Sequence, residues 1–145
     1  MSLGGFVIMW ILAVVGMTLF SAAWTVVSGN EFREPKRLSI LMQRARGKSS
    51  GNNTNVWGWI IHFLLGIPFL GFYEVLWKLT AAPRTVVWSV VFGCALGVLG
   101  VLGWMLLFKI VGVSTQFKYR QFYVHIFFAH IVFSVTALLV YTLLL

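Results

Sequence analysis

Four apolar stretches, each long enough to cross a bilayer, fill most of this 145-residue chain. A helix needs only about 20 residues to cross a hydrocarbon core about 30 Å thick. With 60% hydrophobic and three acidic residues, the chain has little material for a soluble domain. We therefore predict one domain, residues 1–145, that is an all-α membrane protein with four transmembrane helices in an up-down bundle. The stretches are Gly4–Val27, Val56–Trp77, Thr85–Phe108 and Phe122–Leu145.

The basic residues between these stretches predict the orientation. A net charge of +8 would suggest a nucleic-acid partner in a soluble protein, but here short loops carry the charge, so no such partner is expected. The loop 29–55 and the loop after the third stretch are more basic than the second loop, which has only Lys78 and Arg84. The positive-inside rule therefore places the loop 29–55 in the cytoplasm and both termini outside. We expect a bacterial inner membrane.

The loop 29–55 also contains a helical pattern. Pro35 suits a helix start, and apolar residues follow at the spacing of one helix face: Leu38, Leu41, Met42 and Ala45. We predict a short interfacial amphipathic helix on anionic lipid headgroups, with basic residues at the membrane surface: Arg37, Arg44 and Arg46. A docking surface for an acidic partner is the alternative.

A stripe of small residues runs along the third apolar stretch. Ser89, Gly93, Gly97 and Gly100 follow one another at helical spacing, leaving one face of that helix almost without side chains. Membrane helices associate closely along such stripes. We assign Gly93, Gly97 and Gly100 to packing, either inside the bundle or between protomers of a homo-oligomer.

Three histidines lie within the apolar stretches, where ionisable groups are costly and are candidates for function. At 1.5 Å per residue, His62 lies about 9 Å along from Val56, whereas His125 and His130 lie about 5 Å and about 12 Å along from Phe122. In an up-down bundle, His62 is then at a depth between the other two. A shared site is therefore possible. The alternative is that each imidazole only makes a structural hydrogen bond.

Helical angles favour two of the three histidines. His125 and His130 are separated by about 140° around a helix, and His130 shares its face with small and polar residues. On the second stretch, His62 shares a face with Tyr73, and Pro68 between them frees a backbone carbonyl, a feature that often lines a cavity. We predict that His62 and His130 approach one another and that His125 is a weaker candidate.

Glu74 is the only acidic residue outside the first loop. Lys78 follows at i+4, in the favourable order for an ion pair near the outer interface. Glu74 is therefore either half of a rim ion pair or, with Tyr73, a proton or cation acceptor at the mouth of a cavity.

Four short strings carry a resemblance to a known family: Gly16–Ser21, Phe32–Pro35, His62–Gly66 and Phe72–Tyr73. They resemble small YagU-like bacterial inner-membrane proteins of unknown function. The resemblance covers roughly the first half of the chain and implies a four-helix inner-membrane protein, with His62 and Tyr73 as residues of interest. It implies no activity.

These residues favour a protein that binds or translocates a small ligand, a proton or a metal ion at a His-centred site. One alternative is a haem b electron-transfer protein with His62 and His130 as axial ligands. Another is an accessory or assembly subunit of a larger membrane complex, without a site of its own. We do not expect an enzyme, because the sequence has no recognisable nucleophile motif, paired carboxylates or metal-binding motif.

Overall fold

The computed structural model describes residues 2–47, 56–112 and 117–144. Every regular element in this part of the chain is a helix: α1 (Leu3–Ser28), α2 (Glu34–Ala45), α3 (Val56–Thr80), α4 (Val86–Val111) and α5 (Tyr119–Leu144). Four of them, α1, α3, α4 and α5, are long and apolar enough to cross a membrane. The chain is a polytopic membrane protein built as a helical bundle. Residues 48–55 of the predicted first loop and Leu145 lie outside the described residues.

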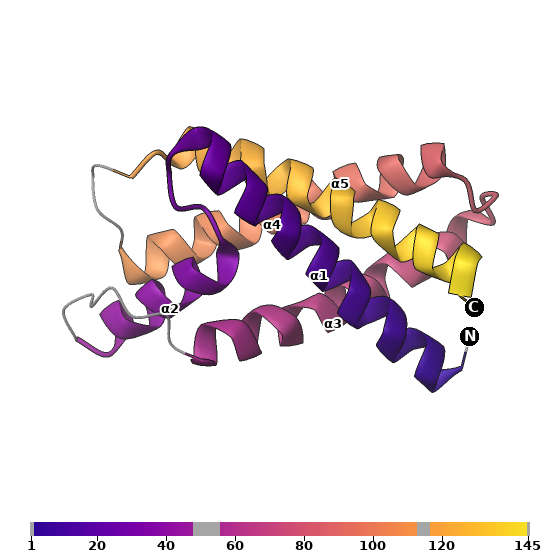
Figure 1. The fold of residues 1–145 in the computed structure, drawn as a ribbon, viewed down its shortest axis with the longest axis horizontal. Coiled ribbons are helices and arrows are strands. Elements are labelled where there is room, and N and C mark those ends of the chain that lie inside the picture. The colour runs from indigo at the N-terminus through magenta and orange to yellow at the C-terminus, as the bar shows by residue number, and fades with distance from the viewer. Residues whose placement is uncertain (1, 48–55, 113–116, 145) are drawn as a thin grey trace.

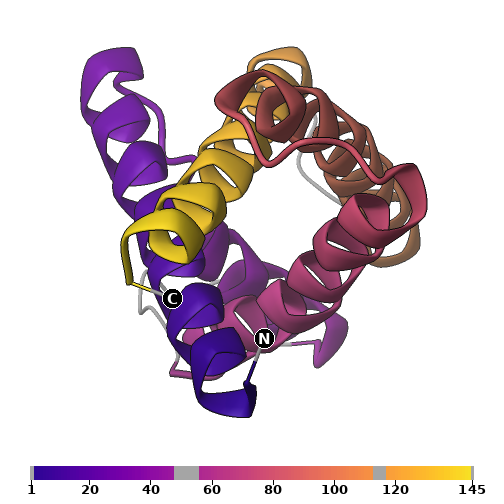
Figure 2. The ribbon, with the colours of Figure 1, turned by 90° about the vertical axis from the view of Figure 1, so that its right-hand side faces the viewer.

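The long helices enclose the interior of the bundle. The ends of the chain lie at one end of the molecule and α2 lies at the other (Figure 1). Seen along the bundle, α1, α5, α4 and α3 form a ring (Figure 2). The closest packing is of α5 against α4 and α1, whereas α3 touches α1, α4 and α5 only lightly. The loose side of the ring is therefore the side that α3 closes.

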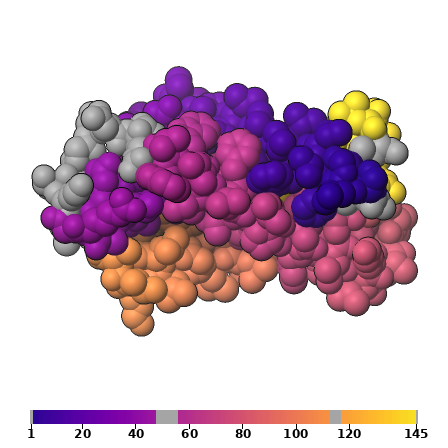
Figure 3. Space-filling view, turned by 90° about the horizontal axis from the view of Figure 1, so that it is seen from below, coloured from indigo at the N-terminus to yellow at the C-terminus, as the bar shows by residue number. Residues whose placement is uncertain are grey.

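The first connection supplies the element that fills part of this loose side. Helix α2 packs against α3 and, more lightly, α4 (Figure 3). Gly58 allows the close approach, because a Cβ there would overlap the Pro35 carbonyl and the Ser39 side chain. Leu38 and Leu41 of the predicted apolar face are buried in an apolar cluster that includes Trp104 of α4 and Phe122 of α5, whereas Ala45 is exposed. The apolar face of α2 thus serves protein packing.

The arginines of this segment differ in their surroundings. The Arg37 guanidinium donates to the Glu31 carbonyl, with Nε at 2.7 Å, and lies over the Phe117 ring at 4.5 Å from its centroid. Arg44 reaches the Gly112 carbonyl at 3.4 Å, and Arg46 is exposed. Of the three arginines expected at the membrane surface, Arg37 and Arg44 thus both contact the protein, and Arg37 is the more closely engaged.

The long helices extend beyond the predicted apolar stretches. Helices α3 and α4 end three residues later than predicted, at Thr80 and Val111, and α5 begins three residues earlier, at Tyr119. Hydropathy marks only the part of a helix that lipid surrounds, whereas backbone hydrogen bonds continue into the polar ends. Helix α1 stops at Gly29, whose φ of 64° is the left-handed conformation of a helix C-cap.

The small-residue stripe of α4 lies against α5. A Cβ at Gly97 would be 2.9 Å from the Phe127 carbonyl oxygen, and one at Gly93 would be 2.8 Å from the Ile131 Cα. Gly100 faces the His130 ring. Of the two predicted uses of the stripe, packing inside the bundle is the one that this structure contains.

Candidate functional site

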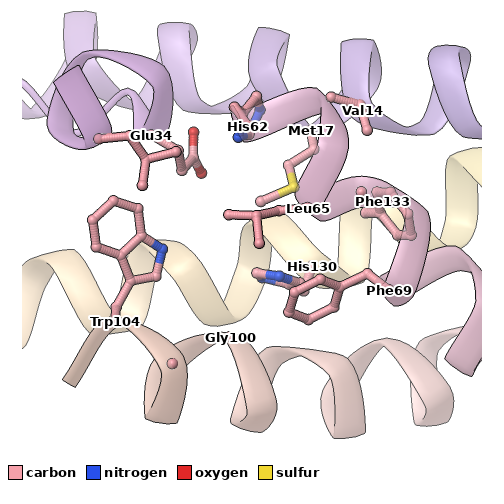
Figure 4. A pocket seen from close by; sticks show the side chains of 13 residues that line it. Val14, Met17, Glu34, His62, Leu65, Phe69, Gly100, Trp104, His130 and Phe133 are labelled. Carbon is pink, nitrogen blue, oxygen red and sulfur yellow. The ribbon is translucent and has the colours of Figure 1, made fainter. Parts of the chain in front are cut away.

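A cavity of about 120 Å³ lies between the helices, next to the contact between α2 and α3, and two of its lining residues, Leu65 and Gly103, reach the protein surface. At about 30 Å³ for each molecule, it has room for roughly four waters. Both favoured histidines line it, together with an acidic residue from α2 (Figure 4). The main side chains around it are Met17, Glu34, His62, Leu65, Phe69, Trp104 and His130.

His62 enters the cavity wall from α3 and is buried. Its Nε2 lies 3.0 Å from the Thr18 Oγ1 atom, and that hydroxyl donates its proton to the Val14 carbonyl at 2.7 Å. Because a hydroxyl has one proton, Nε2–H must be the donor to Thr18. The Nδ1 atom of a neutral His62 therefore carries a lone pair.

His130 reaches the cavity from α5. Its Nδ1 lies 2.8 Å from the Ile126 carbonyl oxygen, which can only accept, so Nδ1 carries the hydrogen and Nε2 the lone pair. The ring packs on Phe69, with centroids 4.6 Å apart. A Cβ at Gly100 would overlap the imidazole, so that glycine makes room for the ring. Within the described residues no hydrogen bond joins His130 to His62 directly.

The third polar wall is Glu34, the first residue of α2. Its side chain is buried, and Figure 4 shows the carboxylate directed into the cavity between His62 and Trp104. The Ser21 hydroxyl lies within hydrogen-bond distance of two acceptors, Glu34 Oε1 at 2.8 Å and the Met17 carbonyl at 3.0 Å, whereas Glu34 Oε2 is buried and has no hydrogen-bond partner among the described residues. Burial raises the pKa of Glu34 from its ordinary 4.5 to about 7, because the charged form loses its hydration. Glu34 can thus gain or lose a proton near neutral pH.

His125 is connected to this carboxylate through Ser21. Its Nε2 lies 2.9 Å from the Ser21 Oγ atom and 3.8 Å from Glu34 Oε1. If Nε2–H donates to Ser21, and Ser21 donates to Glu34 and not to the Met17 carbonyl, the donors form a chain that ends at the cavity. The ring is fully buried, with Phe20 and Phe32 stacked at 5.9 Å, and Nδ1 has no hydrogen-bond partner in the described part of the chain.

This cluster is not arranged as a nucleophile, a base and an acid. In such a triad the histidine lies between the hydroxyl and the carboxylate. Here the hydroxyl of Ser21 lies between His125 and Glu34 and is completely buried, so no substrate atom can reach it.

Tyr73 and Glu74 lie elsewhere, outside the cavity lining. The Glu74 carboxylate binds both terminal nitrogens of Arg84, at 3.1 and 2.7 Å, so Arg84 forms the ion pair that was predicted for Lys78. A guanidinium fits a carboxylate in this two-bond geometry better than an ammonium does. The Tyr73 hydroxyl donates to the Ser134 carbonyl at 3.1 Å.

The same side chains are poorly arranged for a metal ion. Within the described ranges, no three His, Cys, Asp or Glu side chains are grouped closely enough to hold one. Two imidazoles and one carboxylate line the cavity, but they lie on different sides of it and do not converge on one point.

Sequence reasoning missed Glu34, Ser21 and Thr18. Glu34 precedes a proline in a basic loop. At such a position an acidic residue is expected to be exposed to water and to stabilise the N-terminal end of its helix. A usable signal was that Thr18 and Ser21 lie three residues apart, and so on one face of α1, with Thr25 one turn further along that face. A small hydroxyl pair in an apolar helix needs partners, and the structure shows that these are His62 and Glu34.

No family model matches this chain, and neither the curated proteins nor the solved structures include a significant match to it. The resemblance to YagU-like proteins therefore stays a prediction.

Proposed function

We propose that this membrane protein binds and exchanges protons at an intramembrane site formed by Glu34, His62 and His130. The observation that carries this proposal is the buried Glu34 carboxylate, which has one unpaired oxygen and faces a cavity that both imidazoles line. The ligand that stabilises such a group most directly is a proton, because it removes the buried charge. Burying an unpaired charge is so costly that a carboxylate takes up a proton instead.

The imidazoles complete the site. In the tautomers set by their hydrogen bonds, His62 and His130 each keep one basic nitrogen. These nitrogens can accept hydrogen bonds from water or from protonated Glu34, so a proton can be shared within the cavity. The Ser21 and His125 side chains provide a second route to the same carboxylate. We infer that proton exchange here accompanies movement of a proton or a small ligand across the membrane.

The alternative sites predicted from the sequence are less well supported. Pockets for drug-sized ligands measure about 300–1,000 Å³, so a porphyrin would need a much larger space than the 120 Å³ between the two histidines. A haem absorption band in protein purified in mild detergent would reverse this preference. No specific observation favours the accessory-subunit alternative. A subunit without a site of its own would not need a buried acid beside two histidines.

We also infer the topology around the site. In an up-down arrangement with both termini outside, α2 and Glu34 lie at the cytoplasmic side of a bacterial inner membrane, where Arg46 can meet anionic headgroups. A single cysteine at Arg46 should then be protected from a membrane-impermeant reagent added outside, and one at Ala82 should react. The reverse pattern would place the site at the opposite face.

Proton movement in proteoliposomes tests the proposed function. With a pH-sensitive dye inside the vesicles and an imposed pH gradient, the wild-type protein should dissipate the gradient faster than empty vesicles. Glu34→Gln should abolish the difference, because the amide cannot exchange a proton at neutral pH. Glu31→Gln is the matched control, since Glu31 lies three residues away and pairs with Arg33 and Lys36 outside the cavity. Equal rates for wild type and Glu34→Gln would contradict the proposal.

A further inference from the structure

A groove lies apart from the histidine cavity, between the end of α1 and the start of α5. Its volume is about 550 Å³. No histidine or acid lines it. Its walls include Trp24, Val27, Asn30, Lys118, Arg120 and Gln121.

The two cations of this groove, Lys118 and Arg120, have no acidic partner in the described part of the chain. The protein has only three acidic residues. Glu31 pairs with Arg33 and Lys36, Glu74 pairs with Arg84, and Glu34 faces the histidine cavity. Lys118 and Arg120 are exposed, so their positive charge is available to a ligand.

The start of α5 adds to this positive character. The N-terminal end of a helix carries free N–H groups and a partial positive charge, both of which favour an anion. Here that end lies in the same groove as the two cations, next to the polar side chains of Asn30 and Gln121. The polar half of the groove is therefore suited to a phosphate group.

The other half of the groove is apolar. Val27 is 89% exposed, and Val124 and Trp24 continue the surface toward the middle of the spanning helices. Tryptophan is enriched at the level of the lipid headgroups. A phosphate site that continues into an apolar surface at this depth matches the shape of a phospholipid, with a charged head and apolar chains.

We propose that this groove is a binding site for an anionic phospholipid. The phosphate contacts Lys118 and Arg120 at the start of α5, and an acyl chain lies along Val27 and Val124. This site differs from the lipid contact expected at the first loop, where Arg37 is engaged by Glu31 and Phe117. It is independent of proton exchange at Glu34.

Lipid binding can be measured on the full-length protein in detergent by native mass spectrometry with phosphatidylglycerol and phosphatidylcholine. The wild type should bind phosphatidylglycerol more tightly than phosphatidylcholine. The double variant Lys118→Gln/Arg120→Gln should lose about 30-fold in affinity for the anionic lipid at low salt, from the attraction typical of two basic residues. Lys118→Arg/Arg120→Lys, which keeps both charges, should bind as the wild type does.

The matched control is Lys78→Gln/Lys109→Gln, which removes two exposed cations from elsewhere and leaves the same net charge. An equal loss in this control would show a general charge effect and overturn the site. Equal wild-type affinity for the two lipids would overturn it without any variant. Displacement of phosphatidylglycerol by millimolar inorganic phosphate would show a soluble-phosphate site and also contradict the proposal.

Discussion

Replacing Glu34 with glutamine should change how the stability of this protein depends on pH. The pKa of Glu34 rises from 4.5 in an unfolded chain to about 7 in the folded one. The folded state therefore binds more protons than the unfolded state between these values, and stability falls as pH rises through that window. At about 1.4 kcal/mol for each pH unit, the loss is about 3 kcal/mol between pH 4.5 and pH 8.

Glutamine has nearly the same shape and can accept the Ser21 hydrogen bond, but it has no charge to bury. Glu34→Gln should thus have about the wild-type stability at pH 5 and be more stable by up to about 3 kcal/mol at pH 8. Reversible unfolding by SDS in mixed micelles, repeated from pH 5 to pH 8, measures the difference. Taking the difference between the two free energies of unfolding at each pH removes the contributions of groups that titrate in both proteins.

Glu31 provides the control, because its pKa is shifted the opposite way. Its hydrogen bond with Arg33 holds the pKa of Glu31 down to about 2, so its contribution is present above pH 4.5 and is lost only as pH falls toward 2. Glu31→Gln should therefore lower stability by the same amount at pH 5 and pH 8. If the curves of wild type and Glu34→Gln are parallel over this range, Glu34 is not the buried acid described here.

Two further substitutions test the packing and the rim ion pair. Gly97→Leu should destabilise the protein by about 1–3 kcal/mol or prevent folding, because its side chain would enter the α5 backbone, whereas Val98→Leu, at a position 52% exposed, should be nearly neutral in the same unfolding assay. Arg84→Gln should cost about 1–3 kcal/mol, because it leaves the buried Glu74 carboxylate without its partner, and Lys78→Gln should change little. Equal effects within either pair would contradict the contacts that distinguish them.

The four long helices could be predicted because a bilayer imposes a length and an apolar composition that can be counted along a chain. A helix start close to Pro35 could also be predicted, because proline suits the first turn of a helix, and α2 begins at Glu34. The partner of α2 could not, because an amphipathic helix next to a membrane can bury its apolar face in lipid or in protein. Here Gly58 allows α2 to approach α3 closely, so that Leu38 and Leu41 are buried in the protein.

The site was predictable in part for a similar reason. Helical depth and angle favoured His62 and His130, and the structure brings both to one cavity. Glu34 could not be found in this way, because periodicity relates residues within one helix and says little about how a loop folds back on a bundle. The same limit applies to Arg84, which reaches Glu74 from the connection after α3.

The infrared carbonyl band of a protonated carboxyl group tests the central claim most directly, namely that Glu34 takes up and releases a proton near neutral pH inside the bundle. In wild-type protein this band should decrease with a midpoint near pH 7 as the pH is raised, and the decrease should be missing in Glu34→Gln. The account would be contradicted if no carboxyl band changed between pH 5 and pH 9. It would also be contradicted if Glu34→Gln showed the same change as the wild type.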